Sequence, residues 1–444
     1  MLNVNKVLHK LRGEGLGATL VRGSSGFFLI NVVSMGLSFL SAVILARLLG
    51  TEHFGIYTYA LVWIQVLSLL SQLGFKNSLV RFMPAYMVKE QWTLLRGLLM
   101  KSTQYVLTAS LLLAGVAALV IWRLQEALGA AQATTLWISL ALLPVVSLAS
   151  LRAASLRALK LIIKSGVNDS LIRPTVFLLA VIAFAYFSRS PLLAQHVMVL
   201  NIFAALVAFV TGTIWLVRAF PPQLRGATAS FAHSEWLSVS LPMFLIAGMN
   251  LVAKQTDILM IGAYLGPEET AIYAVAARVA GLVMFGLAAV DAMIAPMISE
   301  LYSAGKHQEL QRIVTLATRG VFAFTAAAGA GLVLLGPYLL GIFGEDFGMS
   351  YVPMVILIGG MMVNGMTGPA GFLMTMTKHQ REASLILTVS ALLNVVLNVL
   401  LIPRVGLVGA AAATAATTVL WNVAMLIFVR RRLKINTTVF TRGR

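Results

Sequence analysis

The sequence predicts an all-α integral membrane protein, and three observations support this prediction. Hydrophobic residues make up 59% of the 444 residues, charged residues only 11%, and the mean hydropathy is +0.91. The apolar residues come in blocks long enough to cross a bilayer, which takes about 20 residues per helix. Lys and Arg gather between alternate blocks, and a motif of the first half recurs in the second. This composition excludes a soluble enzyme, since soluble domains carry about 25% charged residues; it also excludes a disordered chain and, with no Cys, a disulfide scaffold.

Twelve blocks have the length of membrane spans, and their lack of polar alternation indicates helices rather than barrel strands. The predicted transmembrane helices are 24–46, 54–74, 102–122, 134–153, 167–187, 194–217, 237–261, 270–294, 320–343, 352–376, 383–402 and 407–429. The first block is longer than the apolar region of a signal peptide, so we expect it to remain as a span. Paired glycines and Gly368-Pro369 make the tenth span the expected bent helix.

The positive charges support this count. With a cytoplasmic N-terminus, 26 of the 33 Lys and Arg residues fall in cytoplasmic segments, and four fall in outer segments or at their edges. Cytoplasmic loops collect Lys and Arg, so both termini are expected in the cytoplasm. The same distribution explains the net charge of +18 without a nucleic-acid partner.

The chain contains an internal repeat. Residues 49–60 read LGTEHFGIYTYA and residues 265–276 read LGPEETAIYAVA, at an offset of 216. Each motif joins the first and second spans of a six-span set, so the halves are predicted to be parallel repeats about an axis along the membrane normal. The expected domains are an N-terminal six-helix lobe at 1–217, a cytoplasmic linker at 218–235, a C-terminal six-helix lobe at 236–429 and a basic cytoplasmic tail at 430–444.

No catalytic pattern stands out. The chain has no Walker A motif, its six His show no metal-ligand spacing, and no triad or carboxylate pair is evident. We therefore expect a protein that is not an enzyme and that has neither a metal site nor a bound cofactor.

Several segments resemble a known family. ILARLLGTEHFGIYTYA (44–60), SQLGFKNSLVRFMP (71–84) and SLRALKLIIKSGVNDSLIRPTVFLL (155–179) are similar to motifs of Wzx-type polysaccharide (O-antigen and exopolysaccharide) flippases. IYAVAARVAGL (272–282) resembles a segment shared with lipid II flippases, and LNVVLNVLLIPRVGLVGAAAATAATTVLW (393–421) resembles a motif of the multidrug/oligosaccharidyl-lipid/polysaccharide exporter superfamily. Twelve spans, rather than the usual fourteen, count against the lipid II branch.

The resemblance implies a V-shaped, two-lobe transporter in the bacterial cytoplasmic (inner) membrane. It implies that the substrate is an undecaprenyl-pyrophosphate-linked oligosaccharide repeat unit, moved from the cytoplasmic to the periplasmic leaflet by alternating access for surface polysaccharide assembly. The implied partners are this lipid-linked oligosaccharide, membrane lipids, a polysaccharide polymerase and a chain-length regulator. Two alternatives remain open: a proton- or sodium-coupled multidrug exporter of the same fold, and a non-transporting scaffold or synthase subunit.

Ionisable residues inside spans are candidate functional residues because their burial in a membrane is costly. Arg278 and Lys254 could bind a pyrophosphate, and Arg278 also matches, by the resemblance, an arginine that lines the lipid II flippase cavity. Lys254 and Asp257 are three residues apart and are expected on one helix face, as part of the site or as a local ion pair. The substrate-binding candidates are Arg278, Lys254, Asn31, Asn250 and Arg47.

Asp257 and Asp291 are the candidate coupling residues, with a proton as the expected ion and sodium as the alternative. A multidrug exporter for cations would need buried carboxylates. In the C-terminal lobe Lys254 and Arg278 accompany the two carboxylates, and these cations favour an anionic substrate. Asp169 and Arg173, four residues apart, are expected to form a structural pair. Asn394 and Asn398 share one face of the eleventh span and are expected to join helices or to bind sugar hydroxyls.

Overall fold

The computed structural model describes residues 16–188 and 190–440, and these ranges contain helices but no strands. The side chains of 16–29 and of scattered helical residues, including the candidates Asn250 and Asp291, lie outside the described part. The chain forms two compact units. The first contains the chain up to Ile44 together with Trp63–Ala247, and the second contains Leu45–Val62 together with Gly248 onward.

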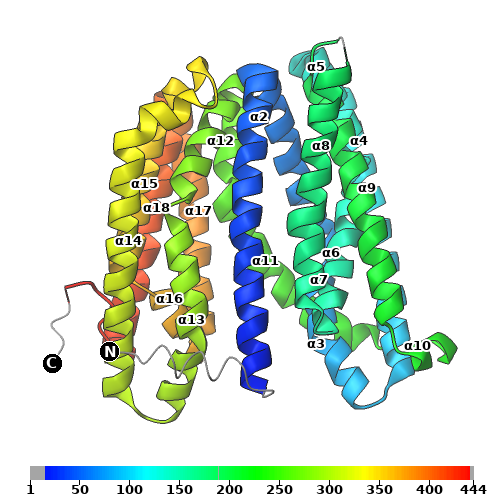
Figure 1. Ribbon diagram of the computed structural model, residues 1–444, viewed down its shortest axis with the longest axis vertical. Helices are drawn as coiled ribbons and strands as arrows, with labels where there is room; N and C mark the ends of the chain where they lie inside the picture. The colour runs from blue at the N-terminus through cyan, green and yellow to red at the C-terminus, as the bar shows by residue number, and fades with distance from the viewer. Residues whose placement is uncertain (1–15, 189, 441–444) are drawn as a thin grey trace. The chain divides into compact units, whose positions relative to one another are not determined.

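The helices before the middle of the chain are α2 (Leu16–Gln72), α3 (Phe75–Val88), α4 (Trp92–Leu128), α5 (Ala130–Ser139), α6 (Leu142–Ala158), α7 (Ile162–Val167), the π-turn η1 (Asn168–Ile172), α8 (Arg173–Phe187), α9 (Ala194–Ala219) and α10 (Pro222–Gly226). The helices after it are α11 (His233–Tyr264), α12 (Pro267–Gly281), α13 (Met284–Ser303), α14 (His307–Gly341), the 3-10 helix η2 (Glu345–Ser350), α15 (Tyr351–Thr367), α16 (Ala370–Met376), α17 (Gln380–Val405), α18 (Leu407–Phe428) and the π-turn η3 (Val429–Leu433). In the first unit α6 packs against α3, α4 and α9, and in the second α14, α15, α18 and α17 pack in sequence, side by side (Figure 1).

The predicted all-helical membrane fold is confirmed. Within the described residues, nine helices are long and apolar enough to cross a membrane, or ten if the two parts of α11 form one span. Predicted spans 1 and 2 fall in one helical run, Ile30–Gln72, whose helical backbone is broken at Gly50. Predicted span 8 is divided between α12 and α13, and many side chains of α13 lie outside the described residues that were tested for spans. The number twelve therefore stays a prediction.

The turns at one end of the helices show the internal repeat in the backbone. Gly50 has φ 69° and ψ −179°, and Gly266, 216 residues later, has φ 110° and ψ −173°. Gly129 (φ 75°, ψ 155°) is likewise matched by Gly344 (φ 143°, ψ 164°), 215 residues later. Only glycine occupies this backbone region at low cost, so the repeat preserves a conformation as well as a motif.

The turns at the other helix ends repeat as well. The amide of Gln91 donates to the carbonyl of Tyr86 at 2.9 Å, and the amide of Lys306 donates to that of Leu301 at 2.9 Å. Leu161–Leu156 and His379–Met374 form the same bond, at 2.9 and 2.8 Å. Each of these turns contains one residue in the left-handed region, at Glu90, Gly305, Lys160 and Lys378. This six-to-one hydrogen bond is the Schellman end of a helix, and it occurs at equivalent places in the two halves.

Within the second unit the two copies of the repeated motif pack on each other. A Cβ added to Gly55 would lie 1.7 Å from the carbonyl oxygen of Pro267, and one added to Gly262 would lie 2.3 Å from the ring of Tyr59. Such distances exclude any side chain without movement of the backbone or the ring, so the absence of a side chain at Gly55 and Gly262 permits this close approach.

The linker region is bound to the first unit. Trp236 is fully buried, and its Nε1 donates to the hydroxyl of Tyr86 at 2.9 Å. Burial raises the pKa of the Tyr86 hydroxyl, so it remains protonated at neutral pH. The amide of Ser230 donates to the carbonyl of Thr93 at 3.0 Å.

The predicted break in span 10 is present. Helix α15 ends at Thr367, and the next residue, Gly368, has φ 64° and ψ −158°.

Candidate transport site

Arg278 lies on the one open face of a helix that is otherwise buried. In α12, Ile272, Tyr273, Val275, Ala276 and Val279 are each at most 3% exposed. The side chain of Arg278 is exposed, and the residues around it on this face are Ala274, Ala277 and Gly281, which are half-buried or small. Tyr57 lies close enough to interact electrostatically with the guanidinium. A cation beside such small residues leaves room for a bound anion.

Asp257 sits at the centre of a polar network that joins four helices of the second unit. The carboxylate is 5% exposed, and its Oδ2 accepts hydrogen bonds from the Tyr273 hydroxyl at 2.6 Å and from Thr414 Oγ1 at 2.7 Å. Its Oδ1 accepts a bond from Asn398 Nδ2 at 3.3 Å, and Asn398 also donates to Asn394 Oδ1 at 3.0 Å. Hydrogen bonds to a buried charge are what make its burial tolerable.

Of the two interpretations of Lys254 and Asp257, the local ion pair is not what the structure shows. Lys254 is exposed, whereas Asp257 points into the unit toward α12, α17 and α18. Three hydrogen-bond donors replace the cation, so the two side chains belong to different environments although they are separated by a single helical turn.

One atom of this network has no partner. Asn398 Oδ1 is buried without a donor among the described residues. Buried acceptors are almost always satisfied, so this oxygen marks a place where one more donor or a cation would fit.

The other candidates are spread over the fold. Arg47 is exposed, but its Nε donates to the carbonyl of Ile342 at 2.5 Å and its Nη2 to that of Gly341 at 3.3 Å. It therefore caps the end of α14, where the helix dipole favours a cation. Asn31 is exposed on α2. The side chains of the candidates Asn250 and Asp291 lie outside the described residues. Of the candidates that the structure describes, Arg47 and Asn31 are not part of the Asp257 network.

Sequence reasoning missed a buried arginine in the first unit. Arg152 is one of the 26 Lys and Arg residues that the predicted topology places in cytoplasmic segments, yet its side chain is only 4% exposed. Its Nη1 donates to the carbonyls of Ala208 and Phe209 at 2.9 and 2.8 Å, and its Nη2 pairs with Asp169 at 3.1 Å. A Cβ at Gly212 would lie 2.5 Å from Arg152 Nε, so this glycine makes room for the guanidinium.

The expected pairing of Asp169 with Arg173 is also wrong. Asp169 pairs with Arg152, while Arg173 donates to Asn201 Oδ1 at 3.0 Å. The π-turn η1 (Asn168–Ile172) lies between the two residues. One extra residue per turn moves residues four apart off a common face, which a regular helical wheel cannot anticipate.

A weak sequence signal pointed to the Asp257 network. Asn394 and Asn398 were placed on one face of the eleventh span, and they do join helices: Asn394 Nδ2 donates to Thr414 at 3.0 Å. Tyr273 lies inside the repeated motif, where its counterpart in the first half is Tyr57. No sequence pattern indicated the hydrogen bond between Asp257 and Tyr273, because that contact depends on how two helices pack.

Comparison with known proteins follows this geometry. Residues 20–302 match the family described as polysaccharide biosynthesis protein. A curated relative from Haloferax volcanii, named "Probable low-salt glycan biosynthesis flippase Agl15", is 27% identical over 44% of this chain and 40% of its own length. A second, "Probable flippase AglR" of the same organism, is 26% identical over 38% of this chain and 36% of its own length. The match therefore spans well under two thirds of either relative.

Solved structures share the fold. An inward-facing multidrug resistance transporter of the MATE family, in the MOP superfamily, superposes with a TM-score of 0.69 over 96% of both chains at 13% identity. The lipid II flippase MurJ, in an inward closed conformation, superposes with a TM-score of 0.68 over 91% of this chain and 87% of its own, also at 13% identity.

The fold is therefore that of a multi-pass membrane protein with the architecture of flippases and multidrug transporters. Since the family match covers more than half of the sequence, the chain belongs to the polysaccharide biosynthesis protein family.

Proposed function

We propose that this protein translocates an undecaprenyl-pyrophosphate-linked oligosaccharide repeat unit from the cytoplasmic to the periplasmic leaflet by alternating access, for surface polysaccharide assembly. Its place is the bacterial inner membrane with both termini in the cytoplasm, and a polysaccharide polymerase and a chain-length regulator are its expected partners. The family membership and the printed names of the curated relatives support glycan flipping.

The observation that carries the proposal is Arg278. The Arg278 side chain is exposed on a face of small residues in an apolar span, and its planar fork suits phosphate oxygens better than a point charge does. Lys254, exposed and not engaged by Asp257, adds a second cation to the same unit. Arg278 and Lys254 favour a pyrophosphate headgroup over a cationic drug.

Substitution of Arg278 tests the proposal. Arg278→Ala should abolish surface glycan while the protein still inserts and accumulates, and Arg278→Lys should impair transport by loss of the bidentate contact. Arg404, an exposed cation near the end of α17, provides the matched control, and Arg404→Ala should leave the glycan level unchanged. A fully active Arg278→Ala variant would return this residue to a packing role and remove the main support for the proposal.

Asp257 is the proposed coupling residue. No nucleotide-binding motif occurs in the chain, so uphill transport would need an ion gradient. A proton on Asp257, or a sodium ion beside it, would supply the positive partner that Asn398 Oδ1 lacks. The Asp257 carboxylate and the hydroxyl oxygens of Tyr273 and Thr414 supply oxygen atoms, which are the ligands of a hard cation, and the carboxylate can also accept a proton.

Reconstituted vesicles distinguish the two ions. Substrate should move protons across the bilayer with wild-type protein and much less with Asp257→Asn, while Asp346→Asn, at an exposed acid of η2, should behave as wild type. Movement driven by a sodium gradient at equal pH would assign sodium instead. Equal ion flux in wild type and Asp257→Asn, or flipping with no ion flux, would remove Asp257 from coupling.

A proton- or sodium-coupled multidrug exporter of the same fold is the second candidate. The observation in its favour is the buried carboxylate of Asp257, together with the fold shared with the MATE transporter. Export of a cationic dye that depends on Asp257 and not on Arg278 would support this candidate.

A further inference from the structure

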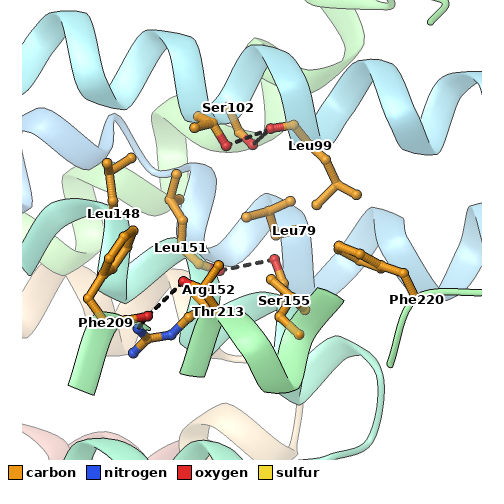
Figure 2. Close-up of a pocket in the computed structure, with 12 residues that line it drawn as sticks. Leu79, Leu99, Ser102, Leu148, Leu151, Arg152, Ser155, Phe209, Thr213 and Phe220 are labelled. Carbon is orange, nitrogen blue, oxygen red and sulfur yellow. Dashed lines mark hydrogen bonds between the residues drawn. The ribbon is translucent and has the colours of Figure 1, made fainter. Parts of the chain in front are cut away.

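The first unit contains a cavity whose lining includes none of the candidate transport residues. It has a volume of about 230 Å³ and is lined by residues of α4, α6 and α9 and by Leu79 of α3 (Figure 2). Its walls are mainly apolar, formed by residues such as Leu148, Leu151, Phe209 and Leu216. Thr103 lines it and is exposed, so the cavity reaches the surface of the protein.

The polar groups of this cavity are turned away from it. Each of its four hydroxyls donates to a carbonyl of its own helix: Ser102 and Thr103 to Leu99, Ser155 to Leu151, and Thr213 to Phe209. Arg152 donates to the carbonyl of Phe209 (Figure 2), and also to that of Ala208 and to Asp169. Its buried Nε has no partner among the described residues, and it lies against Gly212 of α9. Since the walls are mainly apolar and every hydroxyl is engaged, a sugar is a poor occupant of this cavity and an apolar chain is a good one.

The cavity lies at the level where hydrocarbon meets headgroups. On α4 the exposed large apolar residues run from Met100 to Leu124, so Thr103 lies near the start of this stretch. Arg96 lies seven residues before Thr103, on the same face of the helix and about 10 Å along it. It is exposed, and its Nη1 is positioned by a hydrogen bond to the carbonyl of Ala227. Arg96 therefore lies at the level of the lipid headgroups, about two turns of α4 before the cavity opening at Thr103.

Lys101 is a second cation at this end of α4, but it lies two residues before Thr103 and therefore on the opposite face of the helix. Its Nζ sits 5.0 Å from the centre of the Phe231 ring, so Arg96 is the cation on the side of the cavity. No acidic residue lies in α4 before Glu126, so this end of the helix carries net positive charge.

We propose that this cavity binds one acyl chain of an anionic glycerophospholipid of the surrounding bilayer, with Arg96 holding the headgroup phosphate. The volume corresponds to about eight water-sized groups at about 30 Å³ each, which is room for a short stretch of linear chain. A branched isoprenoid chain is wider per unit length and fits such a cavity less well. The site is separate from Arg278 and Asp257, so it stands or falls independently of the glycan substrate.

Photolabelling tests the proposal on the full-length protein in vesicles. Phosphatidylglycerol with a diazirine in its acyl chain should label cavity residues of α9, such as Thr213 and Leu216, in excess over Val210, which is 54% exposed on the same helix. Unlabelled phosphatidylglycerol should compete, and phosphatidylcholine should compete weakly. Arg96→Gln should raise the phosphatidylglycerol concentration needed by roughly fivefold, the value of one surface cation against an anionic lipid.

Two variants serve as checks. Arg123→Gln removes an exposed cation at the opposite end of α4 and should change nothing. Arg96→Lys keeps a cation on the cavity side and should preserve most of the competition, which separates a headgroup contact from a folding effect of Arg96→Gln. Labelling confined to the exposed face, equal competition by phosphatidylcholine, or no effect of Arg96→Gln would overturn the proposal. Stronger competition by a long-chain isoprenyl diphosphate would assign the cavity to that lipid and overturn it as well.

Discussion

Replacement of Asp257 by Asn and by Ala should affect stability very differently. Asp257→Ala leaves the hydroxyls of Tyr273 and Thr414 buried without their acceptor. An unsatisfied buried donor costs about 1–3 kcal/mol, so the two together predict a loss of roughly 2–6 kcal/mol.

Asp257→Asn keeps one oxygen for these hydroxyls and removes a buried charge. The new NH2 group at position 257 would face the Nδ2 of Asn398, and two donors cannot bond each other. Rotation of the Asn398 amide would turn its Oδ1, which has no donor in the wild-type protein, toward that NH2 group. This exchange costs the bond to Asn394, so the net change should stay within about 1 kcal/mol.

The measurement is thermal unfolding of the purified proteins in one detergent, with ion flux measured in parallel on vesicles. The Asp257→Asn variant should unfold near the wild-type temperature and lose ion coupling. The Asp257→Ala variant should lose both thermal stability and ion coupling. If Asn destabilises as much as Ala, the negative charge itself holds the four helices together and the hydrogen-bond argument fails. If Ala unfolds like wild type, the network contributes nothing to stability.

Two further predictions concern packing and topology. Gly212→Ala should destabilise by about 1–3 kcal/mol because its Cβ would meet Arg152, whereas Gly115→Ala, with no atom within 4 Å, should be neutral or stabilising; equal unfolding temperatures would refute the packing argument. Single Cys residues should be labelled from outside in the 262–269 loop and from inside in the 303–312 loop, and labelling of both from one side would disprove the span arrangement.

Hydropathy and charge were enough to predict the fold class, because membrane spans are long and their flanking charges follow one rule. The offset of 216 also predicted equivalent turns, and the backbone of Gly50 and Gly266 has nearly the same conformation. These features depend on composition and short motifs, which a sequence displays directly.

The site was harder to predict because its contacts join distant helices. A helical wheel placed Lys254 beside Asp257, but the carboxylate found three uncharged donors on other helices. The π-turn before Arg173 changed the register that pairs residues four apart. Arg152 looked like a loop cation because the glycine that makes room for it lies 60 residues later.

The chain passes between its two units three times, at residues 44/45, 62/63 and 247/248. The short segment 45–62 is therefore an arm from the N-terminal half of the chain that packs in the second unit. Its Arg47 caps α14, and the Phe54 ring lies 6.2 Å from that of Phe347. A polypeptide cut in the linker would give a second fragment without this arm. During synthesis, the arm is made some 200 residues before its binding surface exists, so the back half can complete its own core only while the front half remains attached or present.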